Sequence, residues 1–147
     1  MSIDHEIPFL HWMGVTVAEW DRSHVLLRMP VSGHNLNRAG VVHGGIYALL
    51  ADAAGGLAGC YSEDAQARVT AYTLSLTTSF LGKVSAGSLH ARGTLRRAGR
   101  QVDFSTIEIT SDEGELLTLG EGSFLYRRPD GAGPVVRSTN NTERDQT

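Results

Sequence analysis

The first half of the chain has two short alternating patterns followed by one long apolar segment. Residues 1–12 are amphipathic and predict a short helix or an arm. Its apolar anchors are Phe9, Leu10 and Trp12. Between residues 14 and 30, valines alternate with polar neighbours, which predicts two strands joined by a turn near Asp21. Residues 32–42 form a polar loop that contains glycine.

Residues 43–61 predict a helix that is apolar on nearly every side. Asp52 is the only formal charge between Gly44 and Tyr61, and a helix of this kind is expected to be buried. A carboxylate in such surroundings costs free energy unless it has a partner or a task. Glycines inside this helix each cost roughly 1 kcal/mol relative to alanine, so we expect a sheet wrapped tightly against it. These glycines are Gly55, Gly56 and Gly59.

The second half of the chain is rich in strand-forming residues. The predicted strands are residues 69–81, 88–97, 101–111 and 116–127. Because short turns join antiparallel neighbours, we expect these four strands to be neighbours in one antiparallel sheet. The single long helix must then lie against one face of that sheet.

Length and composition narrow the class of protein. The 147 residues predict one domain over residues 1–128 and a disordered tail at 129–147, which lacks core residues. A net charge of −3 with spread basic residues argues against nucleic-acid binding. No apolar run approaches the ~20 residues of a membrane helix, and no spacing of Cys and His suggests a metal site. The single cysteine, Cys60, favours the cytoplasm, and its place in the helix predicts a buried apolar side chain.

The start of the helix and its carboxylate together suggest a hydrolytic site. The His43-Gly44-Gly45 segment leaves backbone N–H groups without partners inside the helix, where they can face a bound molecule. Upstream, the spacing Asn-x2-Gly-x2-His-Gly-Gly places Asn37 and Gly40 before this segment, and Asp52 follows nine positions after the histidine.

This motif, with the strand pattern that follows it, resembles the hotdog-fold thioesterases, and more narrowly the phenylacetate-degradation (PaaI-type) acyl-CoA thioesterase family. The likeness covers about residues 10 to 127. It implies an α+β hotdog fold, in which one long antiparallel sheet wraps around a central helix. It also implies hydrolysis of an acyl-CoA thioester to a free acid and coenzyme A, with no metal and no other cofactor.

The resemblance also implies a role for each matching residue. Asp52 would be the general base that activates water, or a nucleophile, and the Gly44 N–H would hydrogen-bond the thioester oxygen. Asn37 would orient the thioester or the water, and Thr73 would hold the water or Asp52. His43 would shape the loop and contact the thioester region. Substrate-binding candidates are Gly45, Arg97 and Arg100, the two arginines through the phosphates of coenzyme A.

Structural alternatives to these roles remain open. Asp52 can be a structural carboxylate, and His43 can simply cap the helix. Asn37 can hold its own loop, because asparagine favours turns. The arginines can keep an exposed hairpin soluble.

The spacing of His43 and Asp52 predicts a dimer. Nine residues are two and a half helical turns, so the two side chains project from opposite sides, roughly 13 Å apart along the axis. Two antiparallel helices could instead bring Gly44 of one chain to Asp52 of the other. We therefore expect a homodimer with two shared active sites and the acyl chain between the helices. The resemblance implies that such dimers pair into a dimer of dimers.

The sequence thus predicts an acyl-CoA thioesterase that acts on aryl or medium-chain acyl groups. Acyl carrier protein remains an alternative to coenzyme A as the thiol carrier. A non-catalytic acyl-CoA-binding hotdog protein and a hotdog dehydratase are the alternative functions. The dehydratase class typically needs a different arrangement of Asp and His.

Overall fold

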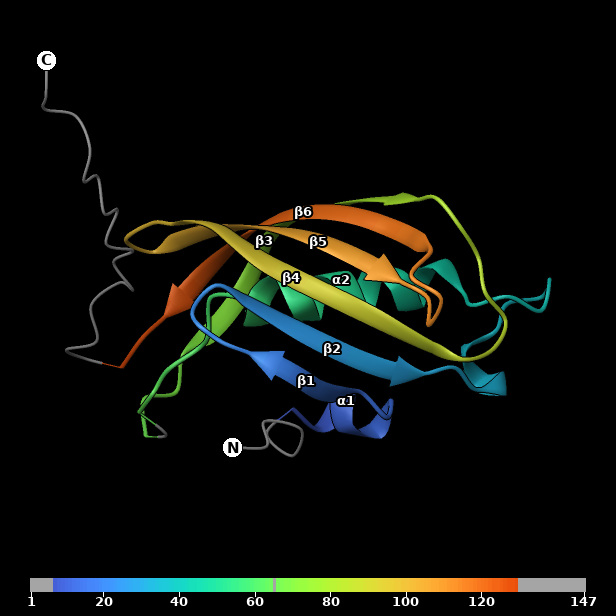
Figure 1. Cartoon of the computed structure of the whole chain (residues 1–147). Coiled ribbons are helices and arrows are strands. Elements are labelled where there is room, and N and C mark those ends of the chain that lie inside the picture. The colour runs from blue at the N-terminus through green and yellow to red at the C-terminus, as the bar shows by residue number, and fades with distance from the viewer. Residues whose placement is uncertain (1–6, 65, 130–147) are drawn as a thin grey trace, which may run out of the picture.

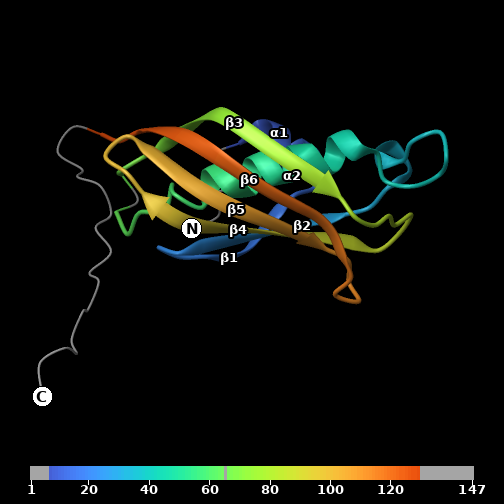
Figure 2. The same cartoon turned by 90° about the horizontal axis from the view of Figure 1, so that it is seen from above.

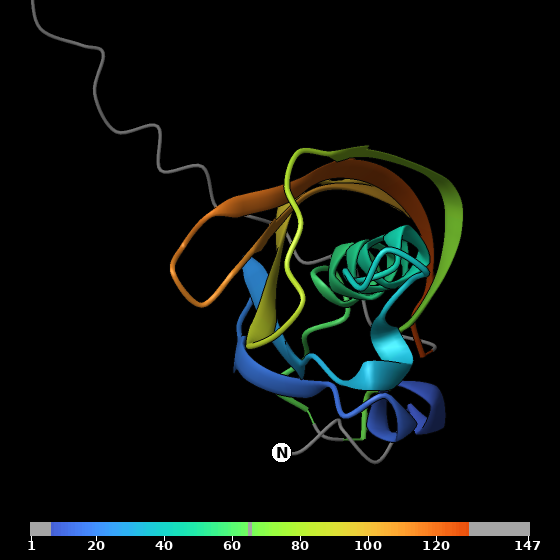
Figure 3. The same ribbon diagram turned by 90° about the vertical axis from the view of Figure 1, so that its right-hand side faces the viewer.

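Six antiparallel strands form one sheet that curves around the long helix in the computed structural model of this chain (Figure 1). The structure describes residues 7–64 and 66–129. Along the chain the elements are α1 (Pro8–Trp12), β1 (Thr16–Trp20), β2 (His24–Pro30), the 3-10 helix η2 (Gly33–Asn35), α2 (Gly44–Leu57), β3 (Thr70–Phe80), β4 (Ser88–Ala98), β5 (Val102–Thr110) and β6 (Leu116–Arg127). The predicted α+β hotdog arrangement is confirmed, and the end-on view shows the sheet wrapped around α2 (Figure 3).

The strand order differs from the predicted one at a single connection. The order in the sheet is β1-β2-β4-β5-β6-β3, so β3 pairs with β6 while β4 pairs with β2 (Figure 2). The prediction that β3 and β4 are neighbours is wrong, because the segment between them is no tight turn. Instead Val84 accepts a hydrogen bond from the Val42 N–H, and the Leu81 N–H donates to Leu117. These bonds hold the segment that connects β3, at one edge of the sheet, to β4 in its middle.

Glycines allow α2 to lie close to the sheet, as predicted. A Cβ atom on Gly55 would lie 2.6 Å from the Phe124 ring, and one on Gly59 would lie 2.5 Å from the Tyr126 ring. On the sheet side, a Cβ on Gly93 of β4 would overlap the carbonyl of Ala54 in α2. The backbone at these helix glycines therefore packs against aromatic side chains of the sheet. At Gly93 the backbone of the sheet packs almost directly against the backbone of the helix.

The helix is shorter than predicted, since α2 ends at Leu57 rather than at residue 61. Its last carbonyls bond to side chains from the sheet. The Tyr126 hydroxyl donates to the Gly56 carbonyl at 2.7 Å, and the Trp20 indole N–H donates to the Leu57 carbonyl at 2.9 Å. The same two carbonyls also accept from the Gly59 and Cys60 N–H groups in the turn that follows, so side chains and turn together satisfy this end of the helix.

One face of α2 is not covered by the rest of the chain, so the prediction of a helix buried on every side is wrong for one subunit. Asp52 is exposed, and Ile46, Leu49 and Ala53 are only half-buried. The reason is geometric. The sheet curls around the opposite face, and its edge strands β1 and β3 do not meet.

The N-terminal helix α1 has one buried anchor rather than three. Leu10 is buried, but Phe9 is 52% and Trp12 is 77% exposed, and these two rings stack on each other with centroids 6.1 Å apart. Residues 1–6 of the predicted arm and residues 130–147 of the predicted tail lie outside the described residues. In the part that is described, no helix has the length and apolar character needed to span a membrane.

Candidate active site

The loop before α2 is held by its two asparagines. The Asn35 carbonyl accepts a hydrogen bond from the His43 N–H at 2.8 Å, which ties the loop to the start of the helix. Asn37 Oδ1 accepts from the N–H groups of Ala39 and Val41, and Gly40 adopts φ +78°, a conformation that favours glycine. Asn37 therefore holds its own loop through its oxygen. Its amide nitrogen has no partner within residues 7–64 and 66–129 and can still donate to a substrate.

His43 caps the helix. It is the N-cap residue of α2, and its Nδ1 accepts a hydrogen bond from the Gly45 N–H at 2.8 Å. An accepting Nδ1 carries no proton, so the proton of the neutral imidazole is on Nε2. The structure thus shows His43 as a helix cap. The Gly45 N–H, which the sequence analysis listed as a substrate-binding candidate, donates to this cap instead.

The Gly44 N–H is the donor that remains at the start of α2. Within the described residues nothing accepts a hydrogen bond from it. The partial positive charge of the helix N-terminus adds to the electrostatic pull of this donor on an oxyanion. The ring of Phe80, at the end of β3, lies beside Gly44, 3.9 Å from the position that a Cβ atom would occupy.

Asp52 and Thr73 form a hydrogen-bonded pair between α2 and β3. The Thr73 hydroxyl donates to Asp52 Oδ1 at 2.5 Å, and both side chains are exposed in the single chain. Thr73 faces the helix because its strand partner is Phe124, which is fully buried. A β-bulge between Thr73 and Ser75 changes the register at this point, and bulges commonly re-aim side chains beside active sites. The structure therefore brings together two residues that are 21 positions apart in the sequence.

A cavity of about 690 Å³ opens beside this pair. It lies along the uncovered face of α2, between α1, the end of β1 and the start of β3. Its apolar lining includes Leu10, Trp20, Leu49 and Ala53, and its polar lining includes Asp52 and Thr73. This size and mixture are typical of small-molecule sites, which are mostly apolar with a few placed polar groups.

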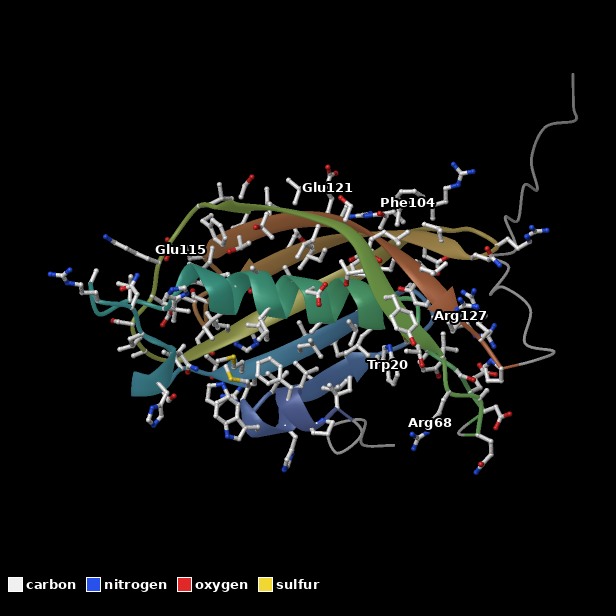
Figure 4. All side chains as sticks on the ribbon, turned by 180° about the vertical axis from the view of Figure 1, so that it is seen from behind. Trp20, Arg68, Phe104, Glu115, Glu121 and Arg127 are labelled. Atoms are coloured by element: carbon white, nitrogen blue, oxygen red, sulfur yellow. The ribbon has the colours of Figure 1, made fainter. Side chains whose placement is uncertain are left out.

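The two predicted phosphate-binding arginines lie away from the cavity. Arg97 and Arg100 belong to the hairpin between β4 and β5, whose Gln101 carbonyl bonds to the end of β6 at Tyr126. The cation that lines the cavity is Arg68, which no motif in the sequence singled out. Figure 4 shows Arg68 and Arg127 at the same end of the molecule, beyond the C-terminal end of α2.

The Cys60 thiol is poorly suited to act as a nucleophile. Cys60 is buried as predicted, and burial raises the pKa of its thiol to about 12, so the thiolate nucleophile is scarce near neutral pH. In the described part of the chain, no three His, Cys, Asp or Glu side chains group closely enough to hold a metal ion.

Comparisons of the sequence and the fold with known proteins point to one family. Residues 39–118 match the sequence model of the family described as the thioesterase superfamily. A candidate esterase from Halobacterium salinarum is 32% identical over 136 residues, which cover 86% of this chain and 88% of that protein. The crystal structure of a thioesterase from Haemophilus influenzae is similar with a TM-score of 0.71 and 26% identity, covering 81% of this chain and 82% of that one. A thioesterase from Staphylococcus aureus shares the fold with a TM-score of 0.76 at 19% identity, covering 82% and 99%.

Proposed function

Because this chain belongs to the thioesterase superfamily, with the hotdog fold, we propose that it hydrolyses the thioester of an aryl or medium-chain acyl-CoA to the free acid and coenzyme A. The family gives the reaction class, thioester hydrolysis. The acyl group, the carrier, the PaaI-type subgroup, the cytoplasmic location and the individual residue roles are the proposal. Arg97 and Arg100 remain candidates for the phosphates of coenzyme A.

The observation that carries this proposal is the Asp52–Thr73 pair beside the cavity. The Thr73 hydroxyl occupies Asp52 Oδ1, which leaves Oδ2 to accept a proton from water. The water oxygen attacks the thioester carbon while its proton passes to Asp52. The thiolate of coenzyme A then leaves and takes up a proton. Direct attack by Asp52, with water hydrolysing the resulting anhydride, is the alternative route for the same residue.

A backbone donor stabilises the charge that develops during this attack. The Gly44 N–H has the open position and the helix end that an oxyanion requires. Removing one such donor in other hydrolases costs about 3–4 kcal/mol of transition-state stabilisation. The Asn37 amide nitrogen is available to orient the thioester or the water.

The proposal includes a homodimer with shared active sites. β3 is an edge strand of 11 residues, and its Tyr72 and Leu74 side chains are each 56% exposed. A long edge strand with exposed apolar side chains can pair with another strand. The same dimer would cover the open face of α2 and bring Gly44 of one protomer to Asp52 of its partner. Pairing of two dimers into a tetramer is a further part of this proposal.

Thiol release from a panel of acyl-CoAs tests the function. The Asp52→Asn variant should lose about 10²–10⁴-fold in turnover, the range attributed to a general acid or base. Its melting temperature should stay near that of the wild type, because Asp52 is exposed and Thr73 is its side-chain partner in the described part of the chain. Full turnover by Asp52→Asn would refute the role of Asp52. Saturable binding of acyl-CoA without thiol release by the wild type would favour the non-catalytic alternative.

Mixing two inactive variants tests whether the site is shared. Gly44→Pro removes the donor, and proline suits the first helical position after an extended His43 with ψ 136°. When Asp52→Asn and Gly44→Pro dimers exchange subunits, each mixed dimer of a shared-site enzyme has one intact site. An equal mixture should therefore regain about a quarter of wild-type turnover. No recovery after proven exchange would place both residues in a site within one chain.

A further inference from the structure

The cavity beside Asp52 runs along the helix toward a tryptophan. Leu49, Asp52, Ala53, Gly56 and Leu57, all from α2, line it in that order along the chain. Asp52 and Leu57 are five residues apart, which is about 7.5 Å along the helix axis. An apolar group bound to the thioester carbon at Asp52 can therefore extend several ångströms before it reaches the level of Leu57.

Trp20 is fixed at that level. Its indole N–H donates to the Leu57 carbonyl at 2.9 Å, and its ring meets the ring of Tyr61 edge-on, with centroids 5.8 Å apart. Figure 4 shows Trp20 below the C-terminal end of α2. If the ring moved away, the half-buried indole N–H would lose its acceptor, whereas the Leu57 carbonyl would keep its bond from the Cys60 N–H. Trp20 is therefore a preorganised wall of the cavity.

The other walls near Trp20 suit an apolar ligand. Leu10 from α1 and Leu57 from α2 are buried, and Phe9 contributes a half-exposed ring. Polar lining lies at both ends of this apolar stretch. Asp52 and Thr73 stand at one end, and Ser62, Asp64 and Arg68 stand at the other.

We propose that this cavity within one chain is the acyl-binding site, and that Trp20 is a specificity-determining residue that contacts the distal part of the acyl group. The inference rests on the proposed hydrolysis at Asp52. It places the acyl group between α1, α2 and β3 of a single protomer rather than between the two helices of a dimer. An acetyl group ends before Trp20, whereas an octanoyl group reaches it.

The kinetic test compares acyl-CoAs of increasing length. Trp20→Ala should lower kcat/KM for octanoyl-CoA about tenfold, the low end of what one apolar contact contributes to discrimination, and leave acetyl-CoA within twofold. Trp12→Ala is the matched control, because Trp12 is 77% exposed and does not line the cavity. It should leave both substrates unchanged. If Trp20→Ala fails to fold, Trp20→Leu removes part of the same contact and should show a smaller loss for octanoyl-CoA, again without a loss for acetyl-CoA.

A fluorescence test needs no turnover. The chain has two tryptophans, so Trp12→Phe leaves Trp20 as the sole reporter and Trp20→Phe leaves Trp12. The probe is S-octyl-CoA, in which a methylene group replaces the thioester carbonyl group of octanoyl-CoA. This thioether cannot be hydrolysed. Titration should give a saturable change in the emission of Trp20 that is clearly larger than any change in that of Trp12, whose ring stacks on Phe9 of the lining.

The outcomes separate this inference from the proposed function. Turnover by the wild type, together with equal losses for acetyl-CoA and octanoyl-CoA in Trp20→Ala, would overturn the acyl-site assignment while hydrolysis stands. A silent Trp20 on saturating probe would overturn it as well. A saturable Trp20 signal without thiol release from any ester would support the assignment and refute hydrolysis.

Discussion

The two faces of α2 both consist mainly of small and apolar residues, but one packs against the sheet and the other is left uncovered. On the packed face, Leu50, Ala54 and Gly55 lie buried against the sheet. On the open face, Leu49 and Ala53 are half-buried, and Asp52 is exposed beside a cavity. The packed face has no charge and no space, whereas the open face has the one carboxylate of the helix and room for a ligand.

This difference shows how one helix can serve stability and chemistry separately. Contacts on the packed face are so close that a single added methyl group would collide with the neighbouring element. Among the residues that the structure describes, Thr73 is the side-chain partner of Asp52 on the open face, and the other carboxylate oxygen can face a substrate or water. Substitutions on the packed face should therefore change folding, and those on the open face should change turnover.

The largest effect is expected from Gly93→Ala on the packed side. The new Cβ would overlap the Ala54 carbonyl, and a backbone group of a buried helix cannot move aside as a side chain can. We expect a loss of unfolding free energy at or above ~3 kcal/mol, the upper end for overpacked cores. Urea unfolding measures it.

Gly33→Ala is the matched control for that substitution. Gly33 lies in η2, and a Cβ there meets no atom within 4 Å, so this variant should unfold like the wild type. Wild-type stability in Gly93→Ala would mean that α2 and β4 are not held as closely as the comparison of the two faces requires.

An intermediate effect is expected from Thr73→Val on the open side. Valine keeps the shape of threonine but removes the hydroxyl that donates to Asp52. We expect kcat to fall about tenfold, or ~1.4 kcal/mol in activation free energy, because the carboxylate loses its fixed orientation. KM and the melting temperature should change little, and Thr73→Ser should retain activity.

Thr77→Val on the same strand serves as the control. Thr77 pairs with Glu121, whose side chain points away from the helix in Figure 4, so the substitution removes a hydroxyl on the outer face of the sheet. An equal loss of kcat in both variants would show that β3, rather than the Asp52–Thr73 bond, is responsible.

The smallest effect is expected at the border of the two faces, where His43 caps the helix. His43→Ala removes the acceptor for the Gly45 N–H and should cost about 1 kcal/mol of stability. For a chain of this size that lowers the melting temperature by roughly 2–4 °C, which calorimetry can detect. His43→Ser supplies a new cap and should recover both stability and turnover. Recovery of stability alone would show that the imidazole also contacts the substrate.

Much of the fold was predictable because its signals are local. Strand-forming residues and turns located the four strands of the second half within one residue at each end. Alternation indicated two strands between residues 14 and 30, and the apolar run located α2. The glycines of α2 predicted a closely packed sheet, because glycine destabilises a helix unless close packing requires the absence of a side chain. The pairing of β3 with β6 was not predictable from turn length, because the segment after β3 is too long to fix a neighbour.

In the candidate site, too, the features carried by one continuous segment were predictable and those that depend on the fold were not. The spacing of residues 37–52 identified the loop, the cap and the carboxylate, since all of them lie in one continuous segment. The sequence could not show that Asn37 Oδ1 and the Gly45 N–H are used by the loop itself, because those bonds depend on the loop's conformation. Nor could it reveal the cavity, whose lining comes from α1, β1, α2, β3 and the segment before β3.

By itself, the sequence determined the elements, the buried glycine contacts of α2 and the presence of a single carboxylate on that helix. Only the tertiary structure decided that the helix keeps one face open, that Thr73 reaches Asp52, and that Trp20 closes on the Leu57 carbonyl. The physical reason is range. Propensity and periodicity act over a few residues, whereas these contacts depend on a curved sheet that brings distant segments to one side of one helix.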